Sequence, residues 1–219
     1  MVIRHKSFLH GWYYIYRMHT LKSEQLLGNG FSSVNEYLNS VFDYCPDEYF
    51  LKGPRGSKLK FKVDADIRCI TNHEVSKLAK IGLEVNDERY KSNHSKVQVF
   101  MLENDNKTIA IEVPLWLKQE ESVYSCFLGK EPLTGHIDLL RVEDDKIWIW
   151  DYKPNANQEK FAATQTYFYA LMLSKRSGMP LENFRCGYFD SSYAFTFNPN
   201  DVNIMAAEKN LRLFEAREA

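Results

Sequence analysis

The sequence predicts an α/β fold in which a central mixed β-sheet is flanked by helices. Residues 133–153 contain two β-rich runs joined by an acidic turn, which is a β-hairpin pattern. Residues 157–174 then predict a helix, with Asn157 as its N-cap. Residues 184–197 contain two more short runs around a polar turn and predict a second hairpin. Hairpins separated by helices are typical of a sheet covered by helical layers.

The composition fits one globular domain, or a core with one sizeable extension. Of the 219 residues, 44% are hydrophobic and 14% aromatic, which excludes a disordered chain. We divide the chain into a mostly helical N-terminal extension, residues 1–85, and a core, residues 86–219. We expect the extension to cap or narrow the cleft of the core.

The charge balance indicates that any nucleic-acid surface is a local patch. The net charge is −1, from 28 basic and 29 acidic residues. No apolar run is long enough for a membrane span, and the N-terminus lacks the apolar core of a signal peptide. We therefore expect a soluble, cytoplasmic protein that does not bind a membrane.

The strand predicted at residues 147–150 ends in charged residues. It is apolar on both faces and is followed by Asp151-Tyr152-Lys153. Antiparallel pairing within the hairpin would bring Asp138 close to Asp151, and two carboxylates repel unless a cation joins them. Lys153 lies two residues after Asp151 and so shares its face of the strand. Oxygen ligands of this kind suit Mg²⁺, and a metal-bound water there could attack a phosphodiester.

Three motifs carry a family resemblance. Gly135-His136-Ile137-Asp138, Asp151-Tyr152-Lys153, and Gln165 with Tyr169 resemble the G-x-x-D, (D/E)-x-K and Q-x-x-x-Y series of PD-(D/E)XK nucleases. The likeness is to the RecB-like branch, which includes the CRISPR-associated exonucleases, and it covers residues 90–190, about half the chain. It implies a restriction-endonuclease-like core that hydrolyses DNA, as an exonuclease, to 5′-phosphate and 3′-hydroxyl ends.

The resemblance also implies a metal site and roles for its neighbours. Asp138, Asp151 and the Tyr152 backbone carbonyl would ligate Mg²⁺ or Mn²⁺. Lys153 would position or activate the attacking water and stabilise the transition state. Gln165 would hold Lys153 or the substrate backbone, and Tyr169 would contact a DNA phosphate or support the site.

The resemblance further implies a histidine ligand on a helix before the first core strand. Residues 88–103 read as such a helix carrying His94, although a pair of strands is the alternative. His94 is our candidate ligand, with His73 and His136 as rivals. On the strand predicted from residue 108 to 113, Ile109, Ile111 and Val113 would share one face.

Glu112 would then point the other way. Its carboxylate faces either the cleft that contains Asp138 or the solvent. In the cleft it would bind a second metal or contact a ligand of the first.

Two N-terminal stretches combine basic residues with other features. Residues 52–62 form a basic Gly/Pro loop that is either a phosphate-tracking edge or a solvated connector. Its basic residues are Lys52, Arg55, Lys58, Lys60 and Lys62. The aromatic run at residues 12–16 could stack on nucleobases, but a core strand or helix is favoured.

The cysteines argue against a metal cluster. Cys45, Cys69, Cys126 and Cys186 are scattered, with no C-x-x-C motif. Relatives with an iron–sulfur cluster use one upstream cysteine and three near the C-terminus. No cysteine follows Cys186, so no such cluster is expected.

The expected partner is DNA, as a single strand or as duplex ends, together with a helicase or recombination protein. Another class of function also fits the sequence. The same fold could be a catalytically silent nucleic-acid-binding or complex-assembly module in which the carboxylates pair with Lys153. A general acid/base enzyme for a small molecule leaves Lys153 and Gln165 without a role.

Overall fold

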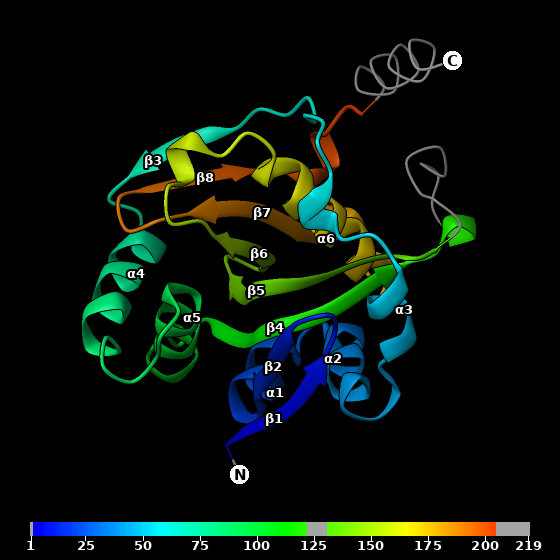
Figure 1. The fold of residues 1–219 in the computed structure, drawn as a ribbon, viewed down its shortest axis with the longest axis horizontal. Coiled ribbons are helices and arrows are strands. Elements are labelled where there is room, and N and C mark those ends of the chain that lie inside the picture. The colour runs from blue at the N-terminus through cyan, green and yellow to red at the C-terminus, as the bar shows by residue number, and fades with distance from the viewer. Residues whose placement is uncertain (1, 122–130, 205–219) are drawn as a thin grey trace.

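One mixed β-sheet organises the protein. The computed structural model describes residues 2–121 and 131–204, and within these ranges eight strands form one sheet in the order β1-β2-β4-β5-β6-β7-β8-β3 (Figure 1). The strands are β1 (Ile3–Leu9), β2 (Tyr13–His19), β3 (Arg68–Thr71), β4 (Thr108–Leu117), β5 (Leu133–Glu143), β6 (Lys146–Tyr152), β7 (Phe184–Phe189) and β8 (Tyr193–Phe197). The strand pairs are antiparallel except β6 and β7, which are parallel. The predicted mixed sheet and both predicted hairpins are confirmed.

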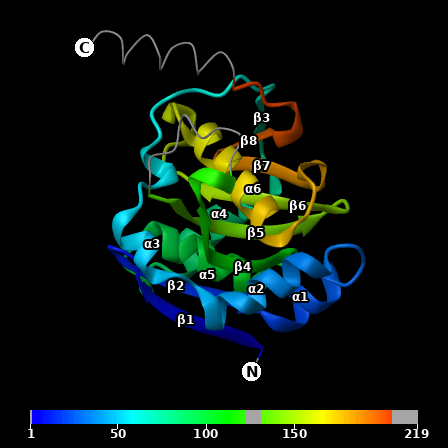
Figure 2. The same cartoon turned by 90° about the vertical axis from the view of Figure 1, so that its right-hand side faces the viewer.

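Helices cover both faces of this sheet. They are α1 (Thr20–Leu27), α2 (Ser32–Tyr44), α3 (Asp47–Lys52), α4 (Glu74–Val85), α5 (Asn93–Asn104) and α6 (Ala162–Ser177). Helices α1, α2 and α6 lie on one face, and α4 and α5 lie on the other (Figures 1 and 2). Two apolar clusters match this division, because one contains side chains of α1, α2 and α6 and the other contains side chains of α4 and α5.

Short 3₁₀ turns connect several of these elements. They are η1 (Gly56–Lys58), η2 (Gln119–Glu121), η4 (Ala156–Gln158), η5 (Leu181–Asn183) and η6 (Pro199–Asp201). No helix in the described part of the chain is long and apolar enough to cross a membrane.

The N-terminal 85 residues join the core sheet at both of its edges. They contain helices, as expected, but β2 also pairs with β4, and β3 pairs with β8. Of the aromatic run at residues 12–16, Tyr13–Tyr16 begin β2 and Trp12 lies in the turn before it. The strand is as favoured, but only Tyr16 of the four aromatic residues is buried in the core, and Trp12 and Tyr13 are exposed.

The ambiguous stretch before β4 is helical, as favoured, because α5 spans Asn93–Asn104 with Ser92 as its N-cap. Helix α6 begins later than predicted, at Ala162, because residues 156–158 form the separate turn η4. It ends at Ser177, three residues beyond the predicted end, and is capped by Gly178, whose φ of 71° is the left-handed conformation that glycine adopts readily. The sequence also predicts a helix from residue 202 to about residue 216. Residues 202–204 are not helical, and the rest of that range lies outside the described residues.

The predicted alternation along β4 was wrong. Ile109 and Val113 pack in the cluster beneath α6, whereas Ile111 packs in the cluster beneath α4 and α5. The register with β5 shifts between Thr108 and Ala110, and Glu112 has a φ of 51° inside the strand. Irregularities of this kind interrupt the regular alternation of faces along a strand, and hydrophobic periodicity alone does not reveal them.

A buried ion-pair network fastens α4 and α5 to the sheet. The side chain of Arg141 on β5 is fully buried, and its Nε lies 2.9 Å from Asp105 Oδ2, just after α5. The same guanidinium lies 2.8 Å from Glu74 on α4 and 3.2 Å from Glu143. Because a buried guanidinium must be paired, this network fixes where both helices sit.

The parallel β6–β7 pair depends on a glycine. Gly187 on β7 lies opposite Trp150, and a Cβ atom there would be 2.3 Å from Cζ3 of the indole. Trp150 is fully buried, so its ring has no room to move aside.

We therefore expect Gly187→Ala to lower the free energy of unfolding by about 1–3 kcal/mol, the usual cost of overpacking a core. Urea denaturation measures this change. Cys69→Ala, on the exposed edge strand β3, is the control and should change stability by less than about 0.5 kcal/mol. Equal stability of Gly187→Ala and wild type would contradict the tight contact with Trp150.

Candidate metal centre

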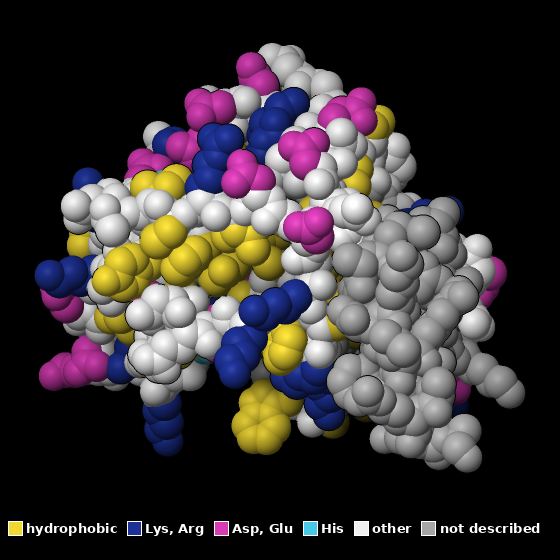
Figure 3. Space-filling view, turned by 90° about the horizontal axis from the view of Figure 1, so that it is seen from above, with side chains coloured by type: hydrophobic (Ala, Val, Ile, Leu, Met, Phe, Trp, Pro, Cys, Tyr) yellow, Lys and Arg dark blue, Asp and Glu magenta, His cyan; other side chains and the backbone are white. Residues whose placement is uncertain are grey.

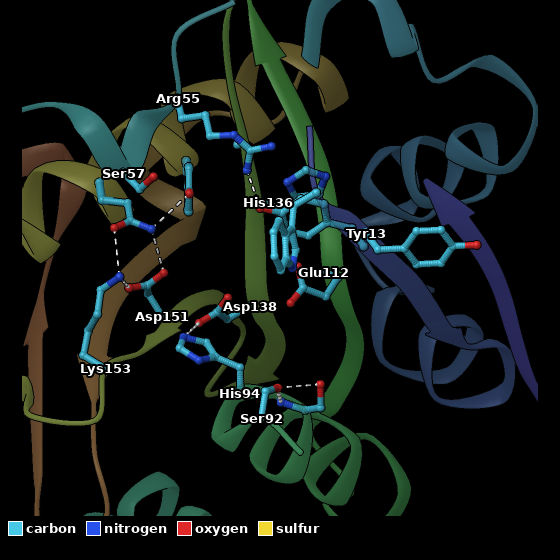
Figure 4. A pocket seen from close by; sticks show the side chains of 16 residues that line it. Tyr13, Arg55, Ser57, Ser92, His94, Glu112, His136, Asp138, Asp151 and Lys153 are labelled. Atoms are coloured by element: carbon cyan, nitrogen blue, oxygen red, sulfur yellow. Dashed lines mark hydrogen bonds and ion pairs between the residues drawn. The ribbon is translucent and has the colours of Figure 1, made fainter. Parts of the chain in front are cut away.

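Three carboxylates lie in a row across neighbouring strands of the sheet. Asp138 on β5 and Asp151 on β6 follow directly from the Leu139–Trp150 pair, so they face one another. Glu112 on β4 falls between two residues that pair with Leu139 and Ile137, which places it opposite Asp138. Figure 4 shows the side chains of Glu112, Asp138 and Asp151 pointing into one cavity.

Lys153 and Gln165 complete a network around Asp151. Lys153 Nζ lies 2.7 Å from Asp151 Oδ2, and it donates a hydrogen bond of 3.1 Å to Gln165 Oε1. Gln165 Nε2 donates in turn to Asp151 Oδ1 at 2.8 Å. The amide thus holds both ends of the Asp151–Lys153 pair, and its orientation is fixed by two charged partners.

Tyr169 supports this network from beneath. Its hydroxyl oxygen lies 3.0 Å from Gln165 Nε2, and the side chain is only 3% exposed. The ring lies against Gly135, where a Cβ atom would be 2.2 Å from Tyr169 Cε1. The glycine of the G-x-x-D motif is therefore required by the tyrosine of the Q-x-x-x-Y motif, because no larger residue fits there.

Asp138 is held from two sides. Its Oδ2 accepts a hydrogen bond of 2.8 Å from the backbone N–H of Tyr152 and lies 3.8 Å from His94 Nε2. His94 is in the first turn of α5 and points into the cavity, toward Asp138 (Figure 4). His73 instead caps α4 and lies against Trp150, so it does not reach the carboxylates.

The carboxylates lack compensating positive charge. Burial and the adjacent Asp138 raise the pKa of Glu112 to about 8, although a hydrogen bond from Gln98 opposes the shift. Burial raises the pKa of Asp151 to about 6; Asp138 adds to the increase, while Lys153 opposes it. Burial disfavours the ammonium form of Lys153, but Asp151 and Asp138 outweigh it and raise the pKa. One lysine therefore does not neutralise the row.

The backbone at Glu112 is strained. Its φ of 51° is rare for a residue other than glycine, asparagine or aspartate. The side chain is held by Gln98 of α5, whose Nε2 donates to a Glu112 carboxylate oxygen at 2.8 Å. Strain that directs a carboxylate toward two others is typical of a functional site. Of the two orientations that the sequence left open for Glu112, the structure has the one in which the side chain faces the cleft.

A chain of side chains that runs from buried His136 through buried His10 to exposed Asp47 was not predicted. His136 Nε2 lies 2.9 Å from His10 Nδ1, and His10 Nε2 lies 3.0 Å from Asp47 Oδ1. Burial lowers the pKa of both histidines, so both rings are neutral at neutral pH. His10 and His136 are 126 residues apart in the sequence, so no local pattern could have paired them.

The basic loop divides into two parts. Arg55 lines the cavity, where its guanidinium donates to the backbone carbonyl of His10 and to the hydroxyl of Tyr14. Lys60 lies over the ring of Phe161, 5.4 Å from its centre. The other lysines of the loop, Lys52, Lys58 and Lys62, are exposed.

On the face of the molecule that is seen from above, Lys and Arg side chains lie in small groups among acidic and apolar side chains (Figure 3). The balanced net charge predicts the same arrangement, in which basic residues form local patches and not a continuous basic face.

The donor set suits a hydrated divalent cation. The cavity has a volume of about 430 Å³, and its polar lining combines three carboxylates with His94. Among the residues the structure describes, only His10, Cys45 and Asp47 place three ligand atoms within 4.8 Å of one another, so the carboxylate row is more open. Mg²⁺ tolerates such a site, because it binds one or two carboxylates and keeps several waters.

Comparison with known protein families gives a match over most of the chain. A family model described as the PD-(D/E)XK nuclease superfamily matches residues 34–218. No curated protein and no solved structure gave a match. The match begins before residue 86 and therefore includes part of the expected extension. It covers most of the sequence, and on that basis the chain belongs to the PD-(D/E)XK nuclease superfamily.

Proposed function

We propose that this protein is a divalent-metal-dependent DNA nuclease, acting as a RecB-like exonuclease that leaves 5′-phosphate and 3′-hydroxyl ends. The observation that carries the proposal is the network in which Gln165 joins Asp151 to Lys153 beside Asp138. A merely structural Asp–Lys pair has no need of two more carboxylates pointing at the same cavity.

Asp138, Asp151 and the Tyr152 backbone carbonyl are the proposed ligands of Mg²⁺ or Mn²⁺, with His94 close to Asp138. Such a cation supplies a nucleophilic water at neutral pH and charge stabilisation at phosphorus. Glu112 is the proposed residue for a second metal, or for orienting water bound to the first. The raised pKa values of Glu112 and Asp151 support cation binding, because a nearby cation would offset both causes of the increase, which are burial first and repulsion by Asp138 second.

Lys153 would stabilise the transition state as a cation. Its raised pKa keeps it an ammonium at neutral pH, so it donates hydrogen bonds to the attacking water or to a phosphate oxygen. Gln165 fixes the position of Lys153, and Tyr169 fixes Gln165. The burial of Tyr169 favours this supporting role over a direct phosphate contact.

The exposed lysines of residues 52–62 are the proposed contacts to the DNA backbone. Arg55 is the member of this group that lines the cavity. The N-terminal residues that border the cavity would narrow its mouth, as a cap on the substrate channel. A helicase or recombination partner remains part of the proposal through the family resemblance alone.

The second candidate is a catalytically silent nucleic-acid-binding or assembly module. The observation that favours it is the 2.7 Å contact between Lys153 and Asp151, which partly satisfies that carboxylate without a metal. In this alternative, neither Glu112 nor Asp138 has a cationic partner as close as Lys153 is to Asp151.

Cleavage of end-labelled DNA in Mg²⁺, in Mn²⁺ and in chelator tests the activity. Wild type should cleave only with metal, and Asp138→Asn or Asp151→Asn should abolish cleavage. Lys153→Ala should reduce the rate by about 100-fold or more, the usual effect of losing a donor to developing charge.

Asp145→Asn in the exposed β5–β6 turn and Lys77→Ala on the surface of α4 are matched controls that should behave as wild type. If wild type binds DNA but cleaves none of the substrates with either metal, the silent-module alternative replaces the nuclease.

The pH dependence of stability tests the proposed cation binding. The pKa values of Glu112 and Asp151 are raised on folding, from 4.5 and 3.8 to about 8 and about 6. The metal-free protein therefore binds more protons than the unfolded chain, and its stability falls as pH rises through this range.

A cation favours the ionised carboxylates, so the increase in melting temperature caused by Mg²⁺ should be larger at pH 8.5 than at pH 5.5. Glu112→Gln should make the metal-free stability less dependent on pH. A Mg²⁺ effect that is equal at both pH values would contradict cation binding by these carboxylates.

A further inference from the structure

The tip of the β1–β2 hairpin exposes two aromatic side chains beside the catalytic cavity. Trp12 is 74% exposed and Tyr13 is 65% exposed. Burial of large apolar side chains normally stabilises a fold, so such groups left in water often mark a binding surface. The nuclease network of Asp151, Lys153 and Gln165 makes no use of either ring.

The tip is held rigidly. Gly11 has a φ of 71°, which permits the tight turn, and His10 N–H donates to the Trp12 carbonyl at 3.0 Å. Arg55 donates to the carbonyl of His10, and the His10 ring is stacked 3.8 Å from that of Phe50. Because the backbone around them is fixed, the exposed rings are presented without a large entropic cost of ordering the loop.

The two aromatic side chains border the cavity through which a nucleic-acid strand would reach the carboxylates. Trp12 and Tyr13 both line the cavity that contains Asp138 and Asp151. Trp12 also lines a neighbouring cavity of about 410 Å³ on the side of Lys58, so it stands at the boundary between the two. Tyr13 extends from the rim on the side away from Lys153 (Figure 4).

Charge favours a nucleic acid as the occupant. Arg55 borders both cavities, and Lys58 lines the outer one and is exposed. Aromatic faces next to basic side chains are the combination that binds single strands, with bases stacked on rings and phosphates near cations. In a fully paired duplex, few base faces are free to stack on an aromatic ring. In an unpaired end, each nucleotide has a free base face.

We propose that Trp12 and Tyr13 form a stacking platform for unpaired nucleobases, so that the substrate reaches the carboxylates as a single strand. The inference rests on the proposed nuclease function and deepens it by naming the substrate class. Trp12, at the boundary of the two cavities, is the principal stacking residue.

Binding of a fluorescently labelled oligothymidylate in chelator tests the platform without cleavage. Trp12→Ala should weaken binding by about 5- to 150-fold, the range for loss of one stacked base, and Tyr13→Ala should weaken it less. Trp12→Phe should restore most of the affinity. Tyr44→Ala, which removes an aromatic residue that is 79% exposed and lines neither cavity, should bind as wild type.

An abasic oligonucleotide of the same length separates stacking from charge. Wild type should bind it more weakly than oligothymidylate, and Trp12→Ala should cause less than a twofold further loss. Equal binding by wild type and Trp12→Ala, an equal loss on both oligonucleotides, or no binding by wild type would overturn the platform.

Cleavage distinguishes failure of the platform from failure of the nuclease. If the platform is wrong and the nuclease is right, Trp12→Ala cleaves single-stranded DNA as wild type does, while Asp151→Asn is inactive. If the nuclease is wrong and the platform is right, Trp12 controls binding although no variant cleaves. If both are right, Trp12→Ala should reduce cleavage of single strands more than that of blunt duplexes.

Discussion

The repulsion among three carboxylates constrains the rest of this structure. Glu112, Asp138 and Asp151 occupy neighbouring positions on three adjacent strands, where burial and mutual proximity raise the pKa values of Glu112 and Asp151. A sheet core does not ordinarily tolerate such a row, because each buried charge needs a partner. Lys153 compensates part of the negative charge, and a divalent cation would compensate the rest. The fold thus holds in place an arrangement of carboxylates that is unfavourable without a bound cation.

Several packing features keep that arrangement in place. Gly135 leaves the space in which Tyr169 supports Gln165, and Gln165 in turn holds both Asp151 and Lys153. On the opposite face of the sheet, the ion pairs of Arg141 fasten α4 and α5, and α5 supplies His94 and Gln98 to the site. The side chains inside the cavity are therefore held partly by one another and partly by the Arg141 network, which does not line the cavity.

The sequence predicted the parts of the site that local patterns encode. The β5–β6 hairpin follows from two apolar runs and an acidic turn, so the proximity of Asp138 and Asp151 was predictable, as was the spacing that aligns Gln165 with Tyr169. The faces of β4 were predicted wrongly, because the irregular backbone at Thr108 and Glu112 leaves no mark in the hydrophobic pattern. The His10–His136 contact and the pairing of β2 with β4 depend on long-range topology, which one sequence does not show.

A crystal structure with Mn²⁺, using anomalous scattering to locate the ion, would test the central claim most directly. The account predicts an anomalous peak between Asp138 and Asp151, with Lys153 still bonded to Gln165. A peak only at His10, Cys45 and Asp47, where three ligand atoms lie within 4.8 Å of one another, would contradict it. So would the absence of any peak at the carboxylates in crystals soaked at saturating Mn²⁺ and alkaline pH.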